Sequence, residues 1–126
     1  MQKAEAAIIL LAHGSRDPLW RQPIEAVAAR IAATQPATAV RCAYIELCAP
    51  SLPEAALALV QGGAQSVSVV PLFLGMGKHA RDDVPRLLAQ LRAAHPGVHW
   101  HLQPAVGEDP RVVQLLAHIA AEPPPP

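Results

Sequence analysis

The sequence predicts a single α/β domain with three layers, in which a four-stranded parallel sheet carries helices on both faces. Short apolar runs alternate with segments of helical spacing, so that a strand and a helix follow each other four times. The chain has 126 residues, about the length of one domain, and 52% of them are hydrophobic, which is enough for a buried core. Consecutive strands are therefore expected to be joined by right-handed crossovers.

Four short runs are predicted to form the strands, and they cover residues 6–12, 38–45, 66–72 and 97–102. The first run is wholly apolar and the third is apolar apart from two serines, which is typical of strands buried on both faces of a parallel sheet. Parallel strands all end at the same edge of their sheet, and the loops that leave this edge build the binding site in open α/β folds.

The first two helices have recognisable start signals. The first is predicted to begin at Asp17-Pro18, an N-cap residue followed by proline. The second is predicted to begin with a capping box, in which Ser51 is the N-cap and Glu54 lies three residues later, and to end near residues 62–63, two glycines. Their apolar faces consist of Trp20, Ile24, Val27 and Ile31 in the first helix and of Leu52, Ala55 and Leu59 in the second.

The last two helices are expected from near Asp82 and from Asp109-Pro110. Four prolines at residues 123–126 cannot continue a helix and predict a disordered tail, so the predicted domain covers residues 1–122. The apolar faces of these helices consist of Val84, Leu87, Leu88 and Leu91 in the third and of Val112, Leu116 and Ile119 in the fourth.

Composition excludes several classes of function. Ten basic and ten acidic residues give a formal net charge of zero, which argues against general nucleic-acid binding. The first apolar run is too short to span a bilayer, and residues 1–5 lack the pattern of a signal peptide, so we expect a cytoplasmic protein with no membrane partner. The spacing of Cys42 and Cys48 fits neither a zinc site nor a redox pair, and both are predicted to be core residues.

Two histidines follow strand-like runs in matching positions. Residues 11–18 read LAHGSRDP and contain His13, and residues 75–83 read GMGKHARDD and contain His79. Both histidines are predicted to lie in loops at the edge of the sheet where the strands end. An imidazole in such a place can accept a proton or bind a divalent metal. The same pattern also fits two structural roles: His13 could cap the end of its strand, and His79 could belong to a solvated, charged helix start.

Charged residues accompany both histidines. Arg16, Lys78 and Arg81 lie in the same two loops, where they would form a positive opening suited to a polyanionic substrate, or else remain ordinary solvated charges. Glu46 ends the second strand at the same edge, where a carboxylate can orient a histidine, accept a proton or contact a metal, or simply lie on the surface.

Other catalytic signatures are weak or missing. Without a G-x-S-x-G elbow, Ser15 is a poor candidate for a hydrolase nucleophile. The sequence has no phosphate loop and no dinucleotide fingerprint, so no organic cofactor is expected. His99 and His101 share one face of the fourth strand, where a metal pair is conceivable but a solvated face is the plainer interpretation. Proton transfer and metal handling are the chemistry that these residues support best.

Four motifs together resemble a known family. They are LAHGSRDP (residues 11–18), YIELxxPSL (44–52), PLFLGxGxHxxxDVP (71–85) and PxxGxxP (104–110). These motifs are similar to those of the class II tetrapyrrole chelatases, and among them to the small single-repeat sirohydrochlorin cobaltochelatases. The resemblance extends over nearly the whole chain up to the proline tail.

The resemblance implies insertion of a divalent metal into sirohydrochlorin, in cobalamin or sirohaem biosynthesis. The metal is the substrate, with Co²⁺ the first expectation and Fe²⁺ or Ni²⁺ the alternatives. His13 and His79 match the two family histidines, which implies metal ligation and catalysis, and Glu46 matches an acidic position. The carboxylates of the macrocycle would be bound by Ser15, Arg16, Lys78 and Arg81.

Longer relatives carry two such domains around one cleft, so a chain with half of that fold is expected to form a homodimer. Two other functions fit the residues: a non-catalytic carrier of metal or tetrapyrrole on the same fold, and a phosphoryl-transfer enzyme with His13 as the nucleophile.

Overall fold

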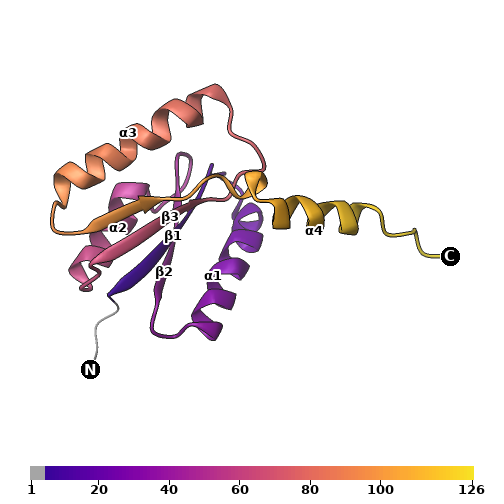
Figure 1. The fold of residues 1–126 in the computed structure, drawn as a ribbon, viewed down its shortest axis with the longest axis horizontal. Helices are drawn as coiled ribbons and strands as arrows, with labels where there is room; N and C mark the ends of the chain where they lie inside the picture. Colours follow the sequence, from indigo (N-terminus) through magenta and orange to yellow (C-terminus); the bar gives the residue numbers. More distant parts are fainter. Residues whose placement is uncertain (1–4) are drawn as a thin grey trace.

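The computed structural model describes residues 5–126, so the expectation for residues 1–4 lies outside the described part of the chain. The elements alternate as expected along the sequence (Figure 1). They are β1 (Ala6–Ala12), η1 (Pro18–Arg21), α1 (Gln22–Thr34), β2 (Ala39–Tyr44), α2 (Leu52–Gln61), β3 (Ser66–Pro71), α3 (Lys78–Ala94), β4 (His99–Leu102), η2 (Val106–Glu108) and α4 (Pro110–Ala120), where η marks a short 3₁₀ helix. All four predicted strands and all four predicted helices are present.

The four strands form one parallel sheet in the order β2-β1-β3-β4. The two central strands are the most apolar, and Ile9, Leu11, Val67 and Val69 are each 0% exposed. This confirms the predicted parallel sheet. Because the strands are parallel, β1, β2, β3 and β4 end at one edge of the sheet, which we call the carboxyl edge.

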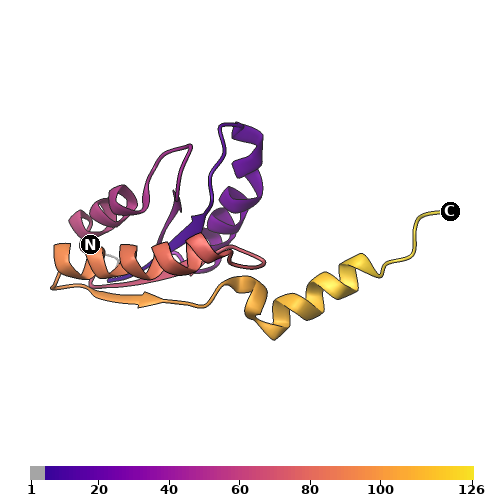
Figure 2. The same ribbon diagram turned by 90° about the horizontal axis from the view of Figure 1, so that it is seen from above.

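The two faces of the sheet are covered unequally. On one face α2 and α3 pack against the strands and enclose the main core, which includes Leu52, Leu59, Val84 and Leu88. On the other face α1 lies over β1 and β2 alone (Figure 2). No residue of α1 is fully buried, so this helix contributes less to the core than its apolar periodicity suggests.

The fourth helix does not return to the sheet. Figures 1 and 2 show α4 projecting away from the body of the domain, beyond the carboxyl edge. Within residues 5–126 it packs mainly against the short η2 turn that precedes it, and none of its residues is buried. The three-layer architecture is therefore complete over β1 and β2 and lacks one helix over β3 and β4.

The start of the third helix differs from the prediction. We expected it near Asp82, but α3 begins at Lys78 with Gly77 as an N-cap that makes no side-chain capping bond. Because no side chain caps this start, the residues around it carry no local start signal. Buried Ala80 extends the apolar face of the helix by one turn and holds this extra turn against the core.

The other start signals act as predicted, with one refinement. At the second helix the Ser51 hydroxyl accepts a hydrogen bond from the Glu54 N–H (3.2 Å), and the Glu54 carboxylate accepts one from the Ser51 N–H (2.9 Å). Asp17 caps the 3₁₀ turn η1, with its carboxylate accepting from the Leu19 N–H at 3.0 Å, and α1 begins only at the end of that turn. Residues 123–126 carry no helix or strand, and their disorder stays a prediction.

Candidate functional site

His13 stands at the carboxyl edge, one residue beyond the end of β1, with its side chain exposed. Its ring stacks on Phe73, with 4.3 Å between ring centroids and an angle of 29° between the ring planes. Phe73 is buried and lies two residues beyond the end of β3. The neighbouring strand therefore supplies an apolar support for the imidazole, which orients the ring while leaving it open to a ligand.

Backbone contacts bring Glu46 next to His13. The Glu46 N–H donates to the His13 carbonyl at 3.0 Å, and the Ile45 N–H donates to the Ala12 carbonyl at 3.0 Å. Gly14 makes this approach possible: its φ is +110°, and a Cβ at that position would overlap the carbonyl oxygen of Glu46. The exposed Glu46 thus lies at the carboxyl edge beside His13.

His79 lies in the first turn of α3 rather than in a loop, which corrects the expectation from the sequence. It is exposed, while the next residue, Ala80, is buried and fixes the helix against the core. Lys78 and Arg81 are exposed in the same turn, which contains no acidic residue. Free N–H groups and the helix dipole add positive potential at this point, so the turn favours an anionic ligand.

The other predicted ligand-binding residues lie at the same edge with different surroundings. Arg16 is exposed in the loop after β1. The Ser15 hydroxyl accepts a hydrogen bond from the Asp17 N–H at 3.1 Å, and this bond stabilises the turn into η1. Arg81 lines a cavity of about 530 Å³, between the 75–76 loop, the start of α3 and the end of β4, which neither histidine lines.

Sequence reasoning missed a set of exposed apolar side chains at this edge. Leu19 and Trp20 lie in the 3₁₀ turn η1 after β1, and Leu47 and Leu74 lie in the loops after β2 and β3; their exposed fractions are 66%, 37%, 51% and 70%. Large apolar side chains clustered on a surface usually mark an interaction site. Leu47 and Leu74 each lie three residues beyond the end of a strand, Tyr44 of β2 and Pro71 of β3.

Metal ligands are incomplete within a single copy of the chain. Among residues 5–126 no group of three or more His, Cys, Asp or Glu side chains is arranged to hold a metal ion. His99 and His101 are exposed on β4 and belong to no such group. A metal held by His13 and His79 would therefore take its remaining ligands from substrate, water or another copy.

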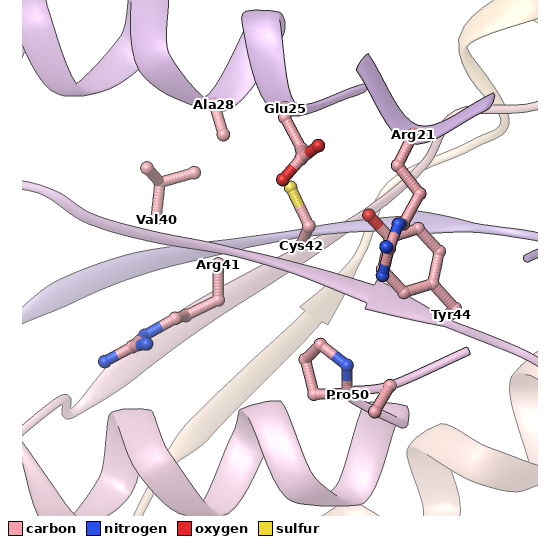
Figure 3. Close-up of a pocket in the computed structure, with 9 residues that line it drawn as sticks. Arg21, Glu25, Ala28, Val40, Arg41, Cys42, Tyr44 and Pro50 are labelled. Atoms are coloured by element: carbon pink, nitrogen blue, oxygen red, sulfur yellow. The ribbon is translucent and has the colours of Figure 1, made fainter. Parts of the chain in front are cut away.

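A separate cavity of about 370 Å³ lies between α1 and β2 (Figure 3). Cys42 lines it together with Arg21, Glu25 and Tyr44, so Cys42 is half-buried beside a cavity rather than a core residue as predicted. Cys48 is half-buried as well. Burial raises the pKa of the Cys42 thiol, and the nearby Glu25 carboxylate raises it further, so this thiol stays protonated and a poor nucleophile at neutral pH.

Fold and site together define a small α/β domain that presents two exposed histidines, a carboxylate and a basic helix start at one edge of a parallel sheet. A family model described as CbiX matches residues 7–122, and this chain belongs to the CbiX family. The match confirms the resemblance that the four sequence motifs indicated. Within the described residues, no helix is long and apolar enough to span a membrane.

One curated relative is the sirohydrochlorin cobaltochelatase of Methanopyrus kandleri, which is 35% identical over 82 residues. These residues are 65% of this chain but only 57% of the relative, so the match spans less than two thirds of its length.

Two solved structures share the fold. A CbiX protein from Marinobacter aquaeolei VT8, described in connection with cobalamin (vitamin B12) biosynthesis, superposes with a TM-score of 0.80 at 36% identity, over 91% of this chain and 93% of that one. The sirohydrochlorin chelatase SirB from Bacillus subtilis subspecies spizizenii, solved in complex with cobalt, gives a TM-score of 0.77 at 29% identity. The SirB match covers 90% of this chain and 49% of SirB.

Proposed function

We propose that this chain is a chelatase, an enzyme of the lyase class that inserts a divalent metal ion into a sirohydrochlorin-type tetrapyrrole for cobalamin or sirohaem biosynthesis. The observation that carries the proposal is the pair of exposed histidines at one edge of a parallel sheet, in a chain of the CbiX family. The name of the Methanopyrus relative and the cobalt in the SirB structure support it.

The two histidines bind the metal and pass it to the macrocycle. Insertion releases two protons from pyrrole nitrogens, and these need acceptors at the edge of the site. His13, His79 and Glu46 are the acceptors we assign, because each is exposed at the carboxyl edge. A metal ligand must be a neutral imidazole, so activity is expected to fall in acid.

Macrocycle binding combines apolar and ionic contacts. The exposed side chains of Leu47 and Leu74 suit a flat apolar ring. The substrate's carboxylates are assigned to Arg16, Lys78 and Arg81 and to the Ser15 turn, because these groups are basic or offer hydrogen bonds at the same edge.

Co²⁺ is the metal we favour, because the cobalt complex of SirB and the cobaltochelatase relative both support it. Imidazole nitrogen suits several divalent ions, so Fe²⁺ and Ni²⁺ are the alternatives to test.

We also propose that the working unit is a homodimer. The chain matches only 49% of the SirB chain, and a second copy would supply an equivalent of the other half. The two-histidine site also lacks ligands within one copy. A cytoplasmic location stays a prediction from the sequence.

The test is the absorbance change of sirohydrochlorin mixed with Co²⁺, followed with and without protein. Wild type is compared with His13→Ala and His79→Ala, and His99→Ala serves as the control because His99 is exposed at the opposite end of the sheet. The expected result is acceleration by wild type and the control, and a loss of at least about 100-fold in each site variant, the scale of acid–base catalysis.

Two other outcomes would overturn the proposal. Tight binding of sirohydrochlorin and Co²⁺ without acceleration would identify a carrier. Absence of both binding and acceleration would remove the tetrapyrrole from the proposal altogether, and hydrolysis of a phosphate ester that requires His13 would then favour phosphoryl transfer.

A further inference from the structure

The cavity between α1 and β2 is separate from the residues assigned to the metal and the tetrapyrrole. None of those residues lines it, so the proposed function does not explain its chemistry. Its volume of about 370 Å³ lies at the small end of the range of roughly 300–1,000 Å³ that is typical of small-molecule sites. The cavity therefore has the size of a site for a small ligand.

Arg21 brings an unpaired donor to this cavity. It ends η1, and its guanidinium lies near the ring of Tyr44 (Figure 3). The Arg21 Nε–H is shielded from solvent, and no atom of residues 5–126 accepts a hydrogen bond from it. Buried donors in folded proteins are nearly always paired, so this one indicates an acceptor from outside the chain. The acceptor that suits a guanidinium best is an oxyanion such as a carboxylate.

Tyr44 places a second donor beside Arg21. Its side chain is 3% exposed, and its N–H donates to the Pro50 carbonyl at 2.9 Å, which fixes this wall of the cavity. The ring of Trp20 packs against it, with 6.1 Å between centroids. Its hydroxyl has Arg21 and the thiol of Cys42 as polar neighbours (Figure 3), and a thiol is only a weak hydrogen-bonding group. Guanidinium and phenol can therefore donate to one oxyanion.

Glu25 supplies the opposite charge. It lies four residues after Arg21, a spacing at which opposite charges on a helix commonly pair. Among residues 5–126, however, neither side chain forms an ion pair. Figure 3 shows the Glu25 carboxylate beside Cys42, apart from the guanidinium. Glu25 is exposed and Arg21 is half-buried, so a ligand with charges of both signs can pair with both, its anionic end innermost.

The remaining lining is mostly apolar. Ala28, Val40 and Pro50 contribute hydrocarbon to the wall. Arg41 is exposed and points away from Arg21 in Figure 3, so it adds positive potential at the rim. A short aliphatic group suits the apolar part of the wall.

We propose that this cavity binds a free amino acid with a short aliphatic side chain. The ligand's carboxylate accepts hydrogen bonds from the Arg21 guanidinium and the Tyr44 hydroxyl. Its ammonium group donates to the Glu25 carboxylate, and its side chain contacts Ala28 and Val40. Binding makes and breaks no covalent bond, and it does not depend on the chelatase reaction.

Isothermal titration calorimetry tests the ligand class with L-valine and two analogues. Isovalerate lacks the ammonium group of L-valine, and isobutylamine lacks its carboxylate. L-Valine is expected to bind, and each analogue to bind at least about tenfold more weakly, because each lacks one charged hydrogen-bonding group. Isovalerate that binds as tightly as L-valine would overturn the proposal. So would no binding of L-alanine, L-valine or L-leucine at concentrations up to about 10 mM.

Two variants test the assigned contacts. Arg21→Gln is expected to weaken L-valine and isovalerate at least about tenfold and leave isobutylamine unchanged, whereas Glu25→Gln is expected to weaken L-valine and isobutylamine and leave isovalerate unchanged. Arg30→Gln is the matched control, because Arg30 is exposed on α1 and does not line the cavity. Far-UV circular dichroism checks that all variants fold. L-Valine affinities that are equal in wild type and both site variants would refute these contacts.

A thiol reaction tests where the ligand binds. In a Cys48→Ala chain, Cys42 is the only thiol, and it lines the cavity. L-Valine at about ten times its dissociation constant is expected to slow the reaction of Cys42 with methyl methanethiosulfonate about tenfold, since only the ligand-free form reacts. Binding of L-valine without protection of Cys42 would place the ligand elsewhere and overturn the proposal. None of these measurements uses a metal or a tetrapyrrole, so their outcome is independent of chelatase activity.

Discussion

Replacing Gly14 with alanine tests how the site is built, because this residue brings the loops after β1 and β2 together. Its φ of +110° lies where residues with a Cβ are strained, at a cost of about 1–3 kcal/mol. The new Cβ would also overlap the carbonyl oxygen of Glu46. Relief of this overlap would displace Glu46 and break the 3.0 Å hydrogen bond from its N–H to the His13 carbonyl. Loss of this bond would lower the free energy of unfolding by about another 1 kcal/mol. Gly14→Ala is therefore expected to lower the free energy of unfolding by about 2–4 kcal/mol.

Urea denaturation followed by far-UV circular dichroism measures this loss, at one protein concentration because assembly changes apparent stability. With a slope of about 2 kcal/mol per molar urea, the midpoint should fall by about 1–2 M. Gly97→Ala is the control, because a Cβ there meets no atom within 4 Å and its φ is not left-handed. It should leave the free energy within about 0.5 kcal/mol of wild type. If Gly14→Ala behaves like this control, the two loops are not held together as we describe.

Three further predictions concern the core, a cap and a titration. Leu88→Ala should cost about 2–5 kcal/mol in urea denaturation because Leu88 is 1% exposed, whereas Leu57→Ala should cost far less because Leu57 is 46% exposed; equal losses would contradict the assigned core. Ser51→Ala should cost about 1 kcal/mol and Ser51→Thr much less, since the hydroxyl caps α2; no difference between the two would argue against the capping box. Burial raises the pKa of Tyr44, the only tyrosine, to about 12, so its absorbance at 295 nm should titrate near pH 12. The neutral phenol is the form that the fold favours, so this contribution to stability is complete below the ordinary pKa of about 10 and is lost as pH rises to 12; a midpoint near pH 10 would contradict the burial.

The elements of the fold were predictable because their signals are local. Apolar runs identify all four strands, and the capping box at Ser51 marks the second helix. The third helix begins four residues before Asp82 because its first turn is held by burial of Ala80 rather than by a side-chain cap. Burial against a distant core cannot be read from the residues near the helix start. The assignment of His79 to a loop was wrong for the same reason.

The placement of the candidate residues was also largely predictable. The motif residues His13, Glu46 and His79 all lie exposed at the carboxyl edge, as the order of strands and helices required. The stacking of His13 on Phe73 was not predictable, because it joins residues 60 positions apart through the pairing of β1 with β3. The half-buried position of Cys42 beside a cavity likewise depends on how closely α1 covers β2.

Periodicity, capping and motif spacing are properties of neighbouring residues, and by themselves they determined the fold class, the family resemblance and the choice of candidate residues. Only the tertiary structure decided which surfaces are covered. The sequence shows that one side of α4 is apolar, but the hydrogen bond from the Gly107 N–H in η2 to the Phe73 carbonyl beyond β3 helps to decide where that side points. Covering a surface requires contacts between residues far apart in the chain, and these form only when the sheet has been assembled.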